Sequence, residues 1–193
     1  MRYLKYLPWA LIFLRISLGP VIVILGVIHS SPILFFLVLL IATLSDIYDG
    51  ILARKLGIAS LQLRIADSRA DLVFWLCAAL ACYVERPDLV QEHRIFVVSL
   101  IAAELSTYII SFLKFKRFPS AHSTIAKLFG LSLMASLTSI LCFHYYGIVF
   151  YGMWSAGVLA NLEINLITLA LPEFKTDIKS LKEALKIRKE RDL

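Results

Sequence analysis

Residues 46–54 read DIYDGILAR and residues 67–71 read DSRAD, which places four aspartates close together in a strongly apolar chain. Asp46 and Asp49 are three residues apart, and Asp67 and Asp71 are four residues apart. Either spacing puts two side chains on one face of an α-helix. The short connection between the two segments predicts antiparallel neighbouring helices. We therefore expect the four carboxylates to converge.

The composition indicates a membrane protein. The chain has 193 residues, of which 60% are hydrophobic, and its mean hydropathy of +0.80 is too high for a soluble protein of this size. A spanning helix needs roughly 20 mostly apolar residues. The apolar runs predict an all-α bundle of six transmembrane helices over residues 9–28, 32–53, 64–84, 94–113, 123–143 and 147–171.

Two regions are expected, a transmembrane catalytic domain over 1–172 and a basic cytoplasmic tail over 173–193. Lysine and arginine are concentrated in alternate connections and at both ends, which predicts cytoplasmic termini in a bacterial cytoplasmic membrane. The net charge of +6 is attributed to topology and lipid head groups, not to nucleic acid. The tail is predicted to lie on the membrane surface, with a frayed soluble tail as the alternative. Its expected apolar face consists of Ile178, Leu181, Leu185 and Ile187.

Clustered carboxylates inside a membrane predict a metal site. Four anions in a low dielectric repel one another unless cations neutralise them. Ligands that are all oxygen suit Mg²⁺, Mn²⁺ or Ca²⁺ better than zinc, and Mg²⁺ commonly joins carboxylates to substrate phosphates. The alternative is a structural set of salt bridges from the aspartates to Arg54, Arg64 and Arg69.

The two segments together resemble the signature of the CDP-alcohol phosphatidyltransferase family, D-x-x-D-G-x-x-A-R followed by G-x-x-x-D-x-x-x-D. Leu63 stands where the second glycine of the signature is expected. The resemblance implies transfer of a phosphatidyl group from CDP-diacylglycerol to an alcohol, with release of CMP. It implies that Asp46, Asp49 and Asp67 hold Mg²⁺ or Mn²⁺, two ions in all, against the pyrophosphate. Asp71 would help to bind metal and act as the general base.

The other signature positions are expected to bind the nucleotide and the phosphates. Gly50 and Ala53 would keep one face of the helix open, and Arg54 would supply a fork of donors to a phosphate. Residues 7–15, LPWALIFLR, resemble the family's opening L-P-N-x-x-T-x-x-R, so Arg15 would face the donor phosphates. Trp9 and Phe13 replace the usual polar residues. The alternative for Arg15 is a pair with some other acid.

The acceptor alcohol is less well specified. In related enzymes a lysine near the start of the fifth span lies close to the acceptor pocket, so Lys127, His122 and Arg117 are candidate ligands for a phosphorylated alcohol. Glycerol 3-phosphate, as used by a phosphatidylglycerophosphate synthase, is favoured, while serine, inositol phosphate and a second lipid stay open. Further intramembrane polar residues either line the same cavity or bond to a neighbouring helix; they are Glu104, Asn161, Glu163 and Asn165.

Two other classes of protein share some of these features. A cation-coupled transporter also carries carboxylates in its spans, but it has no need of Gly50, Ala53 and Arg54 at this spacing. A non-catalytic relative that binds CDP-lipid is the second alternative, given Leu63, Trp9 and Phe13. The family's members are often homodimers, so a dimer of this chain in the bilayer is a further expectation.

Overall fold

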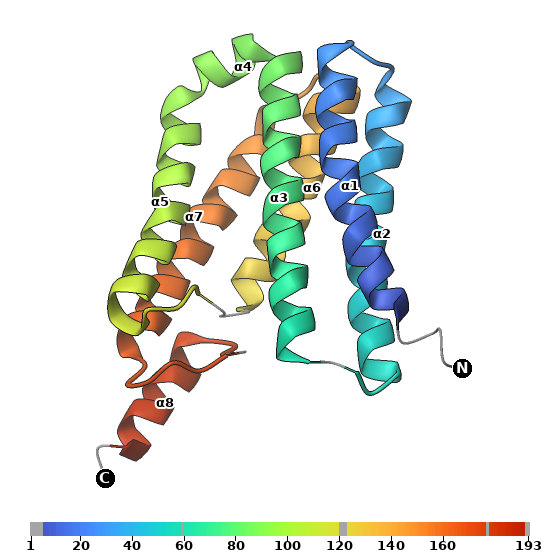
Figure 1. The fold of residues 1–193 in the computed structure, drawn as a ribbon. Helices are drawn as coiled ribbons and strands as arrows, with labels where there is room; N and C mark the ends of the chain where they lie inside the picture. Colours follow the sequence, from blue (N-terminus) through green and yellow to red (C-terminus); the bar gives the residue numbers. More distant parts are fainter. Residues whose placement is uncertain (1–5, 59, 120–122, 177, 192–193) are drawn as a thin grey trace. The chain divides into compact units, whose positions relative to one another are not determined.

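The computed structural model describes residues 6–58, 60–119, 123–176 and 178–191, and every regular element in these ranges is an α-helix (Figure 1). The helices are α1 (Leu7–Val27), α2 (Pro32–Lys55), α3 (Leu61–Glu85), α4 (Pro87–Glu92), α5 (Arg94–Phe115), α6 (Thr124–Phe143), α7 (Gly147–Ala170) and α8 (Leu181–Arg191). The all-α prediction is confirmed.

Five helices in the described ranges, α1, α2, α5, α6 and α7, are long and apolar enough to cross a membrane. The sixth predicted span, residues 64–84, lies within α3. This helix has 25 residues, which is ample length, but its N-terminal half carries Arg64, Asp67, Arg69 and Asp71. Length and composition alone therefore indicate an integral membrane protein with five candidate spans.

The chain forms two compact units. The first consists of Met1–Leu89 and Leu137–Tyr145, and the second of Val90–Ser136 and Tyr146–Leu193. In the first unit, α1 packs along both α2 and α3. The pair α2 and α3 is not among the extensively packed pairs of the described helices. The expectation that the two acidic helices are neighbours did not include α1, which packs along both of them.

Small residues let α1 approach α3 closely. A Cβ atom added to Gly26 would lie 3.1 Å from the carbonyl oxygen of Ala81, and one added to Gly19 would lie 3.1 Å from the Sγ atom of Cys77. The buried apolar residues of this unit include Ile12, Ile22 and Phe74. Glycine at these positions brings α1 against α3 and fixes how far the side chains of α1 reach.

In the second unit α7 packs against α5 and α8. Two polar bonds join α7 to α5: Trp154 Nε1 donates to Ser99 Oγ at 2.8 Å, and Asn165 Nδ2 donates to Ser106 Oγ at 2.8 Å. Such bonds are a common means of helix association in lipid, where apolar burial gives little driving force.

The C-terminal tail packs on the protein. Ile178 and Ala184 belong to an apolar cluster with Ile167, Ala170 and Leu171. Leu181, Ile187 and Phe115 pack against that cluster. Leu185, which was expected on the apolar face, is half exposed, and Ala184 takes the buried position. The apolar side of α8 therefore contacts the end of α7, and its lysines are exposed.

The close approach of α1 and α3 can be tested with Gly26→Ala. In an ordinary helix this change is favourable by roughly 1 kcal/mol. Here the new methyl group would meet the backbone of Ala81, so we expect a net loss of about 1–3 kcal/mol and a lower Tm in detergent. The control is Gly152→Ala, because nothing lies within 4 Å of its added Cβ. A Gly26→Ala protein as stable as the control protein would contradict the packing.

Candidate active site

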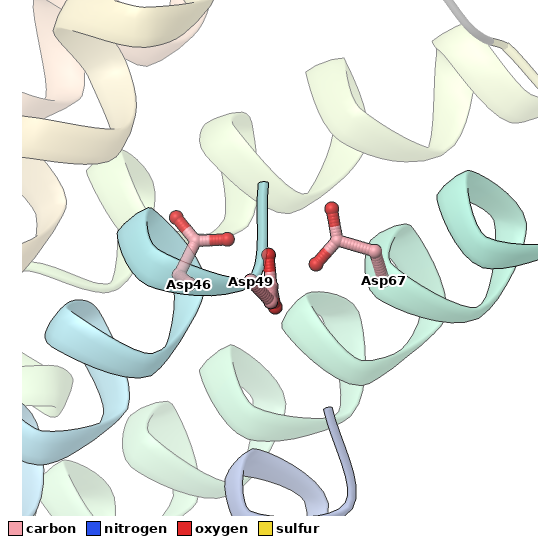
Figure 2. A group of neighbouring side chains, drawn as sticks. All are labelled: Asp46, Asp49 and Asp67. Atoms are coloured by element: carbon pink, nitrogen blue, oxygen red, sulfur yellow. The ribbon is translucent and has the colours of Figure 1, made fainter. Parts of the chain in front are cut away.

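Two helices supply the carboxylates. Asp46 and Asp49 lie in the C-terminal half of α2, and Asp67 and Asp71 lie in the N-terminal half of α3. Carboxylate oxygens of Asp46, Asp49 and Asp67 all lie within 4.8 Å of one another. Figure 2 shows these three side chains turned toward a common space, two from α2 and one from α3. This spacing is compatible with a shared cation.

A third helix enters the site through Arg15 of α1. One of its terminal nitrogens, Nη1, lies 3.1 Å from Asp46 Oδ1 and 2.9 Å from Asp67 Oδ1, and it also contacts Asp71 Oδ1. The other, Nη2, contacts Asp49 Oδ2. Arg15 therefore forms ion pairs with all four aspartates, and it is the group that joins Asp71 to the other three.

Most donors of Arg15 are used within this cluster. A guanidinium has five N–H groups. Its Nε donates to Ser45 Oγ at 3.4 Å, its Nη1 donates to Asp67 and Asp71, and its Nη2 donates to Asp49. The side chain is only 1% exposed. In this arrangement Arg15 has little capacity left for a phosphate.

Exposure differs among the aspartates. The side chain of Asp49 is 4% exposed, whereas those of Asp46, Asp67 and Asp71 are 45%, 34% and 34% exposed. Asp49 and Arg15 therefore form the closed floor of the site. The other three carboxylates form its open side, from which a solute can approach.

The remaining signature residues divide between the site and the packing. Arg54 is exposed, and an added Cβ on Gly50 would lie 3.4 Å from its Nη1, so its side chain runs back over Gly50. Ala53 is buried in an apolar cluster with Ile12 and Leu63. The expectation that Ala53 would keep a face open is therefore wrong, because the side chains of α1 and α3 fill that space.

The candidate acceptor residues belong to the second unit. Lys127 is exposed on α6. Arg117 is exposed too, and its guanidinium carbon lies 5.2 Å from the centre of the Phe174 ring. His122 lies outside the described residues. The grouping of these three around an acceptor stays a prediction.

Three of the other intramembrane polar residues lie on α7, and two of them donate hydrogen bonds. Asn165 Nδ2 donates to Ser106 Oγ of α5, which agrees with the expectation of a bond to a neighbouring helix. Asn161 Nδ2 donates to the carbonyl oxygen of Gly157 in its own helix at 3.0 Å. Glu163 Oε2 and Asn165 Oδ1 are buried without a hydrogen-bond partner in the described part of the chain.

Sequence reasoning missed that Arg15 pairs with the aspartates themselves. It had assigned Arg15 to the donor phosphates, with pairing to some other acid as the alternative. The available signal was charge: an arginine within an apolar span needs a counter-ion, and the aspartates are the nearest concentration of negative charge in the neighbouring predicted spans. Ser45, which is 3% exposed and accepts from Arg15 Nε, was also not predicted.

Comparison with known proteins agrees with this geometry. The model of one protein family, CDP-alcohol phosphatidyltransferase, matches residues 5–162. No curated protein and no solved structure matches the chain. The matched segment covers most of the chain and contains both aspartate pairs and Arg15. On this evidence the chain belongs to the CDP-alcohol phosphatidyltransferase family.

Proposed function

We propose that this phosphatidyltransferase transfers the phosphatidyl group of CDP-diacylglycerol to a phosphorylated alcohol, with the four aspartates as the reaction centre. The observation that supports this most directly is the meeting of three carboxylates within 4.8 Å on α2 and α3, inside a segment that matches the family. Family membership makes the protein a phosphatidyltransferase; the residue roles and the acceptor are our assignment.

The carboxylate ligands of the cluster fit divalent metal ions. All the ligands are carboxylate oxygens, which is the chemistry that Mg²⁺ and Mn²⁺ prefer. When all are ionised, four carboxylates and one guanidinium leave three uncompensated negative charges (4 − 1 = 3). Arg15 therefore neutralises only part of the cluster. We assign two divalent ions to Asp46, Asp49, Asp67 and Asp71; when bound, they would neutralise charge on the pyrophosphate and polarise the phosphorus centre.

Two of the chain's own residues then have a direct task. Arg54, exposed beside Gly50, binds a phosphate of the donor. Asp71, a third exposed, accepts the proton of the acceptor hydroxyl. The acceptor oxygen forms its bond to the phosphorus on the lipid side, and the bond from that phosphorus to the CMP oxygen breaks, so that CMP leaves with the electron pair.

Lys127, Arg117 and His122 are assigned to the acceptor. Lys127 and Arg117 are exposed cations, and a phosphorylated alcohol carries the complementary charge. Glycerol 3-phosphate is the favoured acceptor on this ground, which would make the product phosphatidylglycerophosphate.

The proposed topology has six spans, with α3 as the sixth. Its two aspartates lie in its first half and pair with Arg15, and residues 72–84 of the helix are uncharged. Charged side chains that are ion-paired and face the interior of a helix bundle can be accommodated within a membrane. By the positive-inside rule both termini are then cytoplasmic, on the side where the CDP-activated lipid occurs. A bacterial cytoplasmic membrane and a homodimer complete this proposal.

Removal of the most buried carboxylate tests the metal assignment. Asp49→Asn removes a charge at a position that is 4% exposed, and loss of one ligand should lower metal-dependent CMP release by at least ~100-fold. The matched control is Asp88→Asn, the same change at an exposed aspartate of α4 that pairs with Arg86. CMP release is measured with purified protein, CDP-diacylglycerol and Mn²⁺. Equal activity of Asp49→Asn and the control would refute the assignment.

The base assignment predicts a different pattern for Asp71→Asn. An amide cannot accept the hydroxyl proton, so turnover should fall by roughly 10²–10⁴-fold. The other three carboxylates remain, so binding of CDP-diacylglycerol should stay within about tenfold of that of wild type. Turnover is followed by CMP release, and lipid binding by titration without acceptor. A variant that turns over normally, or one that loses lipid binding altogether, would show that Asp71 has another role.

The acceptor is identified by offering the wild-type protein a panel of alcohols with CDP-diacylglycerol. We expect CMP release with glycerol 3-phosphate, its loss in EDTA and its return with Mg²⁺ or Mn²⁺. Lys127→Gln should raise the KM for the acceptor by about tenfold and leave that for the donor unchanged, because one charged contact is lost. Lys182→Gln, on exposed α8, is the control. Selective use of an uncharged alcohol would overturn the acceptor assignment.

A further inference from the structure

Arg15 contacts the aspartates of the candidate metal site directly, which its place in the signature does not predict. Its guanidinium contacts one oxygen of each carboxylate in the cluster: Asp46 Oδ1 at 3.1 Å, Asp67 Oδ1 at 2.9 Å, and Asp49 and Asp71 besides. Because two cations held close to the same carboxylates repel each other and share their charge, binding of one weakens binding of the other.

We infer that Arg15 is a built-in counter-ion that competes with divalent metal for the aspartate cluster. Its ion pairs join α1 to both α2 and α3 and neutralise one of the four negative charges. A divalent ion held by the aspartates would weaken these ion pairs, and the donors of Arg15 would then be free for an anionic substrate. This inference rests on the proposed function, since it takes the aspartates as the metal ligands.

Burial and hydrogen bonding support this role. Arg15 is 1% exposed, and four of its N–H groups donate to Ser45, Asp49, Asp67 and Asp71. A buried arginine without those acceptors would be strongly destabilised. With four of its five N–H groups used in this way, the guanidinium has little capacity for a phosphate until these bonds are released.

If Arg15 competes with metal, its removal should strengthen Mn²⁺ binding, whereas removal of a residue that only supports the site should weaken it. Removal of Arg15 takes away a rival cation, so Arg15→Gln should bind Mn²⁺ with a Kd lower by ~10-fold or more. If Arg15 merely kept the site in shape, or bound only phosphate, its removal would weaken Mn²⁺ binding or leave it unchanged. Arg15→Lys keeps the charge but cannot reach four carboxylates with one ammonium group, so we expect a smaller decrease in Kd.

The experiment is a Mn²⁺ titration of the full chain in nanodiscs, with free Mn²⁺ followed by electron paramagnetic resonance and no lipid substrate added. The control is Arg69→Gln, which removes an exposed charge from α3 between Asp67 and Asp71; Arg69 has no ion pair in the described part of the chain. Its Kd should stay within about threefold of that of wild type. Arg15→Lys keeps the test decisive if the glutamine variant does not fold.

Thermal unfolding gives a second readout. In EDTA the Arg15→Gln protein should unfold at a lower temperature than wild type, because the aspartates lose their internal counter-ion. Added Mn²⁺ should raise its Tm by more than it raises that of wild type. Arg15 variants that bind Mn²⁺ no more tightly than wild type would overturn this inference alone, provided that wild type binds Mn²⁺ and releases CMP. Absence of Mn²⁺ binding in every protein would overturn the proposed function as well.

Discussion

The pairing of one buried arginine with four aspartates is the interaction on which the first unit depends. Arg15 comes from α1, Asp46 and Asp49 from α2, and the other two acids from α3, so the ion pairs tie three helices together. A charge in an apolar bundle persists only when it is paired. The close approach of α1 to α3 at Gly19 and Gly26 brings Arg15 within reach of α3. Backbone packing and charge pairing therefore require each other.

Two departures from the family pattern meet in one place. Leu63, in the position of the second signature glycine, is 5% exposed and belongs to an apolar cluster with Ile12 and Ala53. Trp9, in the position of a usual polar residue, packs against the same cluster. The larger side chain of Leu63 on α3 therefore packs against apolar side chains of α1 and α2. Leu63 lies one turn before Asp67, so the change affects packing beside the carboxylates and leaves the carboxylates in place.

The sequence predicted the parts of this architecture that depend on local spacing. Two aspartate pairs at helical intervals indicate two acidic faces, and the run lengths indicate membrane helices. It could not show that α1 lies along both α2 and α3, because helix packing depends on the three-dimensional fit of small residues such as Gly26. The same limit explains Ala53 and Leu185: a periodic pattern gives the face of a helix, but the neighbouring helix decides whether that face is open.

The charged residues of the site differ in exposure, so the site is closed on one side and open on the other. Asp49 and Arg15 are closed off, while Asp46, Asp67 and Asp71 are each a third or more exposed. A solute can therefore reach the cluster from the side of the three open carboxylates. Under the proposed roles, Asp71 is both the base and a partner of Arg15. Release of Arg15 from the cluster would therefore leave Asp71 without its guanidinium partner.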